Sequence, residues 1–63
     1  MPGLSDIPNN LKDPDRQLEF LYWLKDLPIS IYEARATMKV WASATGRTFD
    51  AQQWNFIERN FRR

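Results

Sequence analysis

The 63-residue chain has no cysteine, no histidine and only two glycines. Without cysteine no disulfide forms, and a zinc site would lack both of its commonest ligands. The same absences remove the usual general base and the usual thiol nucleophile of enzymes. The two glycines, Gly3 and Gly46, are too far apart in the chain to build a phosphate-binding loop. We therefore expect a protein that is not an enzyme and that binds no metal and no cofactor.

Long hydrophobic runs are missing too. The longest uninterrupted apolar run covers residues 20–24, whereas a membrane-spanning helix needs roughly 20 apolar residues. The first residues match neither a signal peptide nor a myristoylation site. These absences predict a cytoplasmic protein that does not interact with membranes, and the lack of cysteine fits a reducing compartment.

Neither sign of charge dominates, because nine basic and eight acidic residues give a formal net charge of +1. The chain as a whole therefore lacks the positive excess that nucleic-acid-binding domains use to neutralise phosphates. The charge is unevenly distributed, however. Residues 1–32 carry a net charge of −2, and residues 33–63 carry +3. Any basic surface therefore belongs to the second half of the chain.

Three signals for the start of a helix divide the chain: Asp13-Pro14, Ser30 with Glu33, and Asp50 with Gln53. The first signal places a proline where the missing N–H group would be unpaired in any case. The other two have the spacing of a capping box, in which two side chains bond to N–H groups at the helix start. We interpret the acidic residues around Asp13 as part of such a helix start and not as a catalytic or cation-binding pair.

These signals and the spacing of apolar residues predict an all-α fold. We expect one small three-helix domain over residues 13–63, with helices near residues 14–27, 31–45 and 50–62. Residues 1–12 contain turn-forming Pro, Gly and Asn residues. We expect them to form an irregular N-terminal arm that is flexible or loosely packed, with Leu4, Ile7 and Leu11 placed to hold part of it against the body.

An inward face is evident on each predicted helix when residues are placed at 100° intervals. The large side chains of these faces form the predicted core: Phe20, Trp23, Leu24, Trp41, Phe49, Trp54, Ile57 and Phe61. Nine of the 63 residues are aromatic, which is more than three short helices can bury. Tyr22, Tyr32 and Phe56 are therefore expected at or near the surface.

The predicted binding site is the outer face of the third helix, where Phe56 lies among amides and arginines. Exposed aromatic and arginine side chains are the types that contribute most at protein interfaces. The predicted site residues are Gln52, Asn55, Phe56, Arg59, Asn60 and Arg63. We therefore expect a small non-enzymatic protein-binding module, such as an adaptor, an inhibitor or an accessory subunit. The C-terminal arginines also suit the negative end of the helix dipole, a role that requires no partner.

Secondary contacts are expected from the first two helices. Leu18 and Tyr22 lie outside the apolar arc of the first helix, so they form either a docking patch or a surface covered by the N-terminal arm. Arg35 and Lys39 flank the inward face of the second helix, one turn apart. The far side of that helix carries small residues that permit close approach of a second copy, and hence a homodimer: Ala36, Val40 and Ala44.

The alternative is a DNA-binding regulator of the helix-turn-helix type. A helix, a short turn with Gly46 and another helix have the layout of that motif. The third helix would be the recognition helix, because Asn, Gln and Arg side chains read base edges. Against this, Arg47, Gln52 and Asn55 occupy positions where the motif usually has apolar residues. Few cations are also available to contact the phosphate backbone.

Overall fold

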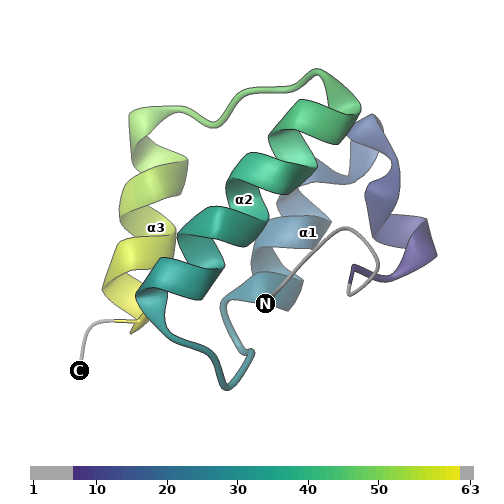
Figure 1. The fold of residues 1–63 in the computed structure, drawn as a ribbon. Helices are drawn as coiled ribbons and strands as arrows, with labels where there is room; N and C mark the ends of the chain where they lie inside the picture. Colours follow the sequence, from purple (N-terminus) through teal and green to yellow (C-terminus); the bar gives the residue numbers. More distant parts are fainter. Residues whose placement is uncertain (1–6, 62–63) are drawn as a thin grey trace.

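The computed structural model describes residues 7–61, which fold into three α-helices preceded by two short 3₁₀ helices (Figure 1). The elements are η2 (Asn9–Lys12), η3 (Pro14–Arg16), α1 (Gln17–Leu24), α2 (Ile31–Thr45) and α3 (Ala51–Phe61). No strand occurs among the described residues, so the predicted all-α three-helix fold is confirmed. No helix in this range is long and apolar enough to cross a lipid bilayer.

Of the two capping boxes predicted from the sequence, the one at α3 forms with both of its bonds and the one at α2 with one of them. Ser30 Oγ accepts a hydrogen bond from the N–H group of Glu33 at 3.2 Å. Asp50 and Gln53 form a reciprocal pair, because the side chain of each accepts the N–H group of the other, at 2.9 and 3.1 Å. Beyond α2 lies Gly46, whose φ of 74° is left-handed backbone that glycine adopts without strain. Local signals in the sequence therefore determine where these two helices begin and where α2 ends.

The first helix is shorter than the predicted range 14–27. Asp13 Oδ1 accepts the N–H group of Asp15 at 2.9 Å, a bond across two residues that favours the tight turn of η3. At the other end α1 stops early, and residues 25–29 form the bend that leads to α2. Pro28 causes part of this difference, because it disfavours helical backbone at the preceding residue and supplies no N–H group.

α1 and α3 run in the same direction, and α2 runs against both of them (Figure 1). Gln17, at the start of α1, bonds to Gln53, near the start of α3. Near the end of α1 and in the middle of α3, the rings of Tyr22 and Phe56 are in contact. α1 therefore lies beside the first half of α3 at the surface.

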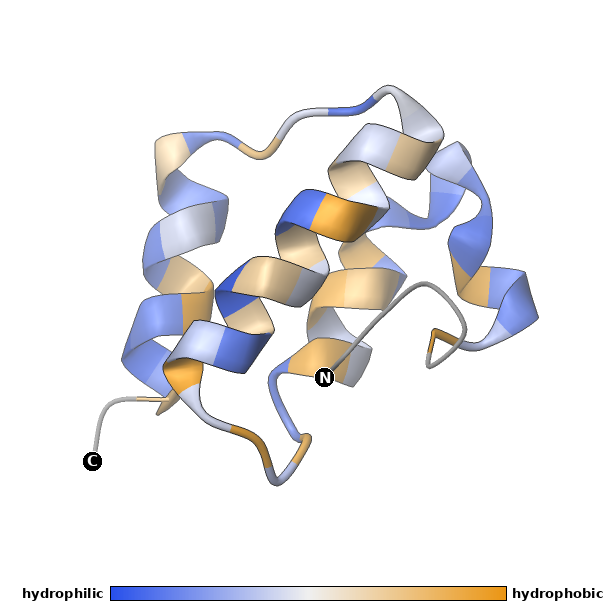
Figure 2. Ribbon diagram, viewed as in Figure 1, coloured by the Kyte–Doolittle hydropathy of each residue, from blue (hydrophilic) through white to orange (hydrophobic). Residues whose placement is uncertain are grey.

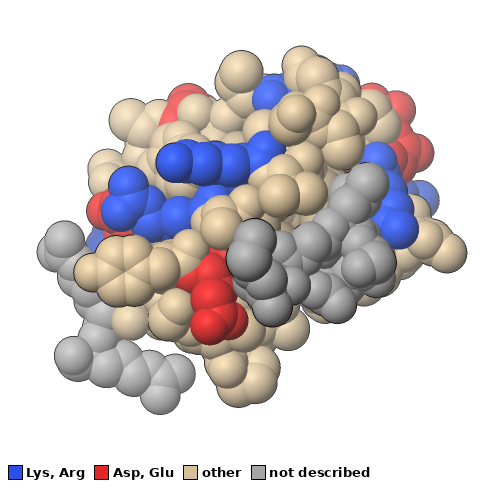
Figure 3. All heavy atoms as spheres, viewed as in Figure 1, with Lys and Arg blue, Asp and Glu red and all other residues tan. Residues whose placement is uncertain are grey.

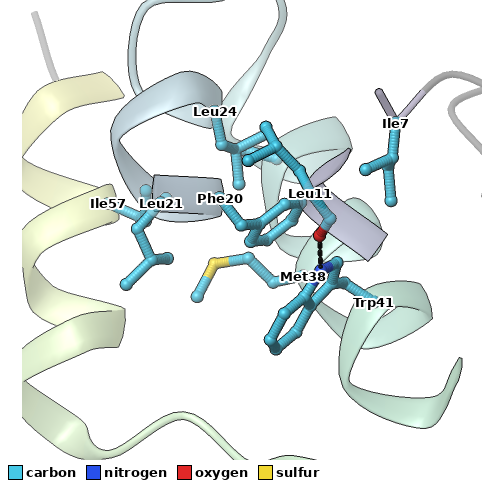
Figure 4. Packing of buried hydrophobic residues seen from close by; sticks show 9 residues of the cluster. Ile7, Leu11, Phe20, Leu21, Leu24, Met38, Trp41 and Ile57 are labelled. Atoms are coloured by element: carbon cyan, nitrogen blue, oxygen red, sulfur yellow. Dashed lines mark hydrogen bonds between the residues drawn. The ribbon is translucent and has the colours of Figure 1, made fainter. Parts of the chain in front are cut away.

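Among the described residues, nine apolar side chains form the buried core: Ile7, Leu11, Phe20, Leu21, Leu24, Ala34, Met38, Trp41 and Ile57. At its centre the rings of Phe20 and Trp41 stack with their centroids 5.0 Å apart (Figure 4). Four aromatic residues that the sequence places in the core are only partly buried and pack against its edge: Trp23, Phe49, Trp54 and Phe61. Figure 2 shows hydrophilic residues recurring along α2 and α3 between hydrophobic ones, the pattern of helices with one face on a core.

The N-terminal segment belongs to this core as far as the structure describes it. Ile7 and Leu11 are only 2% and 6% exposed, and the indole N–H group of Trp41 donates a hydrogen bond to the carbonyl oxygen of Leu11 (Figure 4). The core therefore begins before residue 13, where the sequence analysis places the start of the domain. Leu4, which was expected to help hold the arm, lies outside the described residues.

Candidate interaction surface between α1 and α3

A hollow of about 160 Å³ lies at the surface between α1 and α3. Three residues of each helix line it: Leu18, Leu21 and Tyr22 from α1, and Gln52, Gln53 and Phe56 from α3. We call these six residues the α1–α3 surface. It joins two sets of residues that the sequence analysis treats separately, because Leu18 and Tyr22 are predicted secondary contacts whereas Gln52 and Phe56 belong to the predicted main site.

Large apolar side chains gather on this surface although water reaches them. Leu18 is 61% exposed and Tyr22 is 59% exposed. In the described part of the chain only one other large apolar side chain is exposed to this degree, Tyr32 at 78%. Single exposed apolar residues are ordinary on protein surfaces, whereas a cluster around a hollow is typical of an interaction site. The position of Leu18 and Tyr22 together therefore distinguishes them from Tyr32.

Phe56 connects the surface to the core. It is partly buried and packs against the core cluster, and its ring meets that of Tyr22 at an angle of 71° with the centroids 5.6 Å apart. This edge-to-face arrangement is a favourable geometry for two aromatic rings. The sequence analysis places Phe56 away from the inward face of its helix, at or near the surface. In the structure it lies at the border of that face, on the side toward α1.

Gln17 fixes the separation of the two helices at their first turns. Its Nε2 atom donates to the carbonyl oxygen of Thr48 at 2.9 Å and to Oε1 of Gln53 at 3.1 Å. The same Oε1 atom accepts the N–H group of Asp50. One side chain of α1 is therefore bonded both to the loop before α3 and to the cap of α3. This connection closes one end of the α1–α3 surface.

Three predicted site residues of α3 do not line the hollow: Asn55, Arg59 and Asn60. Asn55 and Arg59 are exposed. The side-chain amide of Asn60 donates to the carbonyl oxygen of Phe56 at 2.7 Å, which turns it back onto its own helix. Arg63 lies outside the described residues. Among the described members of the predicted site, only Gln52 and Phe56 line the hollow itself.

The charges near the α1–α3 surface differ between its two helices. On the α1 side, Glu19 pairs with Arg16 at 2.9 Å, and Asp15 pairs with Arg47 at 3.4 Å. The hydrogen bond from Arg16 to Glu19 raises the pKa of Arg16 above its ordinary value. Arg59 on α3 has no ion-pair partner within the range 7–61.

The other predicted secondary contacts lie elsewhere. Arg35 and Lys39 are exposed on α2, and α2 contributes no residue to the lining of the hollow. Figure 3 shows lysine and arginine side chains gathered over α2 on the face seen in Figure 1. The structure therefore separates these two cations from the α1–α3 surface.

No group of three or more Asp or Glu side chains within the described range is arranged to hold a metal ion. Comparison with protein-family models, with curated proteins and with solved structures found no match.

Proposed function

We propose that this protein is a small non-enzymatic protein-binding module, an adaptor, inhibitor or accessory subunit of the cytoplasm, that binds its partner through the α1–α3 surface. The observation that carries this proposal is the convergence of Leu18 and Tyr22 with Phe56 around one hollow. The absence of cysteine is compatible with a reducing compartment.

The energetics favour a partner that covers these side chains. Complete burial of a leucine side chain contributes about 1.5–3 kcal/mol. Leu18 is 61% exposed, so more than half of that gain remains to be made on binding. Tyr22 adds a rigid ring that loses little conformational freedom when it is covered, and its hydroxyl group supplies a donor at the rim. A partner that covers both side chains therefore gains contacts that the monomer does not make.

A peptide selection tests this proposal without knowledge of the natural partner. The purified full chain is used to select binders from a displayed library of random 16-residue peptides, and amide chemical shifts are then recorded with each selected peptide. We expect the largest shifts at Leu18, Leu21, Tyr22, Gln52 and Phe56. Selection of no peptide, or shifts confined to other residues, contradicts the proposal.

The alternative is a DNA-binding regulator that uses α3 as a recognition helix. Gln52, Asn55 and Arg59 are exposed along α3, and such side chains are able to contact base edges. Two observations weigh against it. The connection between α2 and α3 has five residues, 46–50, where the motif usually has three or four. Arg59 is also the one cation of α3 within the described range.

A titration against duplex DNA separates the two proposals. A DNA-binding protein gives binding at low salt that weakens steeply as salt is added, because counterions return to the phosphates. Such binding, lost on Arg59→Gln but retained on Tyr22→Ala, supports the DNA alternative over the protein-binding module. Absence of binding at low salt excludes the DNA alternative.

A further inference from the structure

Arg59 continues the row of α3 residues that faces the α1–α3 surface. Gln52, Phe56 and Arg59 are spaced i, i+4 and i+7, so they follow one another on the same side of the helix. Gln52 and Phe56 line the hollow, and Arg59 is exposed one turn beyond it. A segment that lies along the hollow therefore passes within reach of the guanidinium group.

The carboxylates nearest to this surface are already occupied. Asp15 and Glu19, beside the first turn of α1, each have an arginine partner of their own. Asp26, beyond the other end of α1, pairs with the lysine that precedes it at 2.9 Å. Glu58 is the neighbour of Arg59 in the chain, but it points about 100° away around the helix, is partly buried, and forms no ion pair with a described residue. The uncompensated charge at this end of the surface is therefore positive.

We propose that the occupant of the α1–α3 surface is an acidic amphipathic helix of another protein, which places an apolar side chain in the hollow and a carboxylate against Arg59. This inference rests on the proposed function of the surface. Two parallel helices side by side form a groove that a third helix fills with apolar residues at i, i+3 or i+4, and i+7. An arginine binds a carboxylate through two parallel hydrogen bonds, which favours an acidic residue over other polar types.

A second copy of this chain fits the surface less well. α1 and α3 are about 12 and 16 Å long at 1.5 Å per residue, so the face that they share measures a few hundred Å². A stable protein interface buries about 800 Å² on each partner. The carboxylates of η3 and α1 that a second copy would offer to Arg59, Asp15 and Glu19, are paired within their own chain. A single helical segment requires neither the larger area nor these carboxylates.

The test compares two arginines with the peptides selected by the full chain. Arg59→Gln and Arg35→Gln each remove one exposed guanidinium that has no ion-pair partner among residues 7–61, but only Arg59 adjoins the hollow. We expect the selected peptides to be enriched in Asp and Glu beside apolar anchors. We expect Arg59→Gln to weaken their binding about fivefold or more, and Arg35→Gln to leave it unchanged.

The outcomes distinguish this inference from the proposed function. Peptides that require Tyr22 but carry no excess of Asp or Glu, and that bind Arg59→Gln as tightly as the parent protein, overturn the acidic helix and leave the protein-binding surface intact. Peptides that bind without Tyr22 or Phe56 overturn both. Concentration-dependent sedimentation of the unliganded protein that disappears on Tyr22→Ala identifies a second copy as the occupant and also overturns the inference.

Discussion

Two groups of apolar side chains lie on different sides of the same small core and differ in what covers them. On one side, Ile7 and Leu11 are buried, and the carbonyl oxygen of Leu11 accepts the indole N–H group of Trp41. On the other side, Leu18 and Tyr22 stay more than half exposed around a hollow. The chain completes its core with its own N-terminal segment on the first side, and the described residues leave the second side open.

This difference shows that small domain size alone does not explain why the α1–α3 surface is exposed. A chain of about 60 residues buries only roughly 60% of its unfolded surface, so some apolar exposure is expected. Ile7 and Leu11 are nevertheless buried in the core, where Leu11 bonds to Trp41, while Leu18 and Tyr22 stay exposed. The hypothesis that the N-terminal arm covers Leu18 and Tyr22 is therefore wrong for the part of the arm that the structure describes.

The largest effect is expected at the covered side. Trp41 is fully buried and stacks on Phe20. Trp41→Ala should lower the free energy of unfolding by about 3–5 kcal/mol, and it also leaves the carbonyl oxygen of Leu11 without its partner. Such a loss approaches the whole stability of a small domain. Thermal or urea unfolding measures it, and an unchanged midpoint would show that Trp41 does not hold the core together.

Two leucines compare the sides directly with the same substitution. Leu11 is 6% exposed and Leu18 is 61% exposed. Leu11→Ala should lower the free energy of unfolding by about 2–3 kcal/mol, because it leaves a cavity against the core. Leu18→Ala should change it by no more than about 0.5 kcal/mol, as is usual for surface positions. Similar losses in urea titrations of the two variants would abolish the distinction between a covered and an open side.

Smaller effects are expected at the connection between α1 and α3. Asp50→Ala removes the side chain that accepts the N–H group of Gln53, so it should lower the free energy of unfolding by about 0.5–2 kcal/mol.

Gln17→Ala removes the bonds to Thr48 and Gln53. This loss should lower the free energy of unfolding by about 1 kcal/mol. Peptide affinity should fall with Gln17→Ala, because the walls of the hollow are no longer held at their spacing. Unchanged affinity at a temperature where the variant is folded would show that Gln17 does not position the surface.

Phe56 lies between the buried core and the exposed α1–α3 surface, so its substitution should affect both stability and binding. Its ring packs against the core edge and against Tyr22, so Phe56→Ala should lower the free energy of unfolding by about 1 kcal/mol, less than a fully buried position loses. Peptide binding should weaken by roughly 2 kcal/mol or more if the ring acts as a hot spot. Calorimetric titration of the folded variant measures this loss. Unfolding of the variant at room temperature would place Phe56 in the core and remove it from the binding surface.

The sequence predicts the parts of the fold that depend on neighbouring residues. The bounds of α2 and the start of α3 follow from caps that bond three residues along the chain. Helical periodicity does not predict the shorter α1. The hydrogen bond that Asp13 accepts from Asp15 favours a 3₁₀ turn at one end, and the bend around Pro28 ends the helix early at the other. The apolar character of Ile7 and Leu11 predicts that they pack against the body, but nothing local indicates that Leu11 bonds to Trp41.

The candidate site shows the same division between local and distant contacts. Helical periodicity separates Phe56 from the inward face of its helix and separates Leu18 and Tyr22 from the apolar arc of theirs. It does not indicate that these two outlying groups meet, because this depends on α1 and α3 lying side by side. The sequence does not predict the bonds of Gln17, because a glutamine at the start of a helix can bond to many different groups. The capping role of Gln53 was the one clue to that connection.

The proposed function requires that the α1–α3 surface, and not exposed aromatic area in general, binds a protein partner. Tyr22 and Tyr32 test it most directly, because both are exposed tyrosines on helices and only Tyr22 lines the hollow. Affinity for the selected peptides is measured for Tyr22→Ala and Tyr32→Ala, after circular dichroism has shown that both variants are folded. We expect a loss of about tenfold or more for Tyr22→Ala and no change for Tyr32→Ala. Equal losses, or a loss only with Tyr32→Ala, would contradict it.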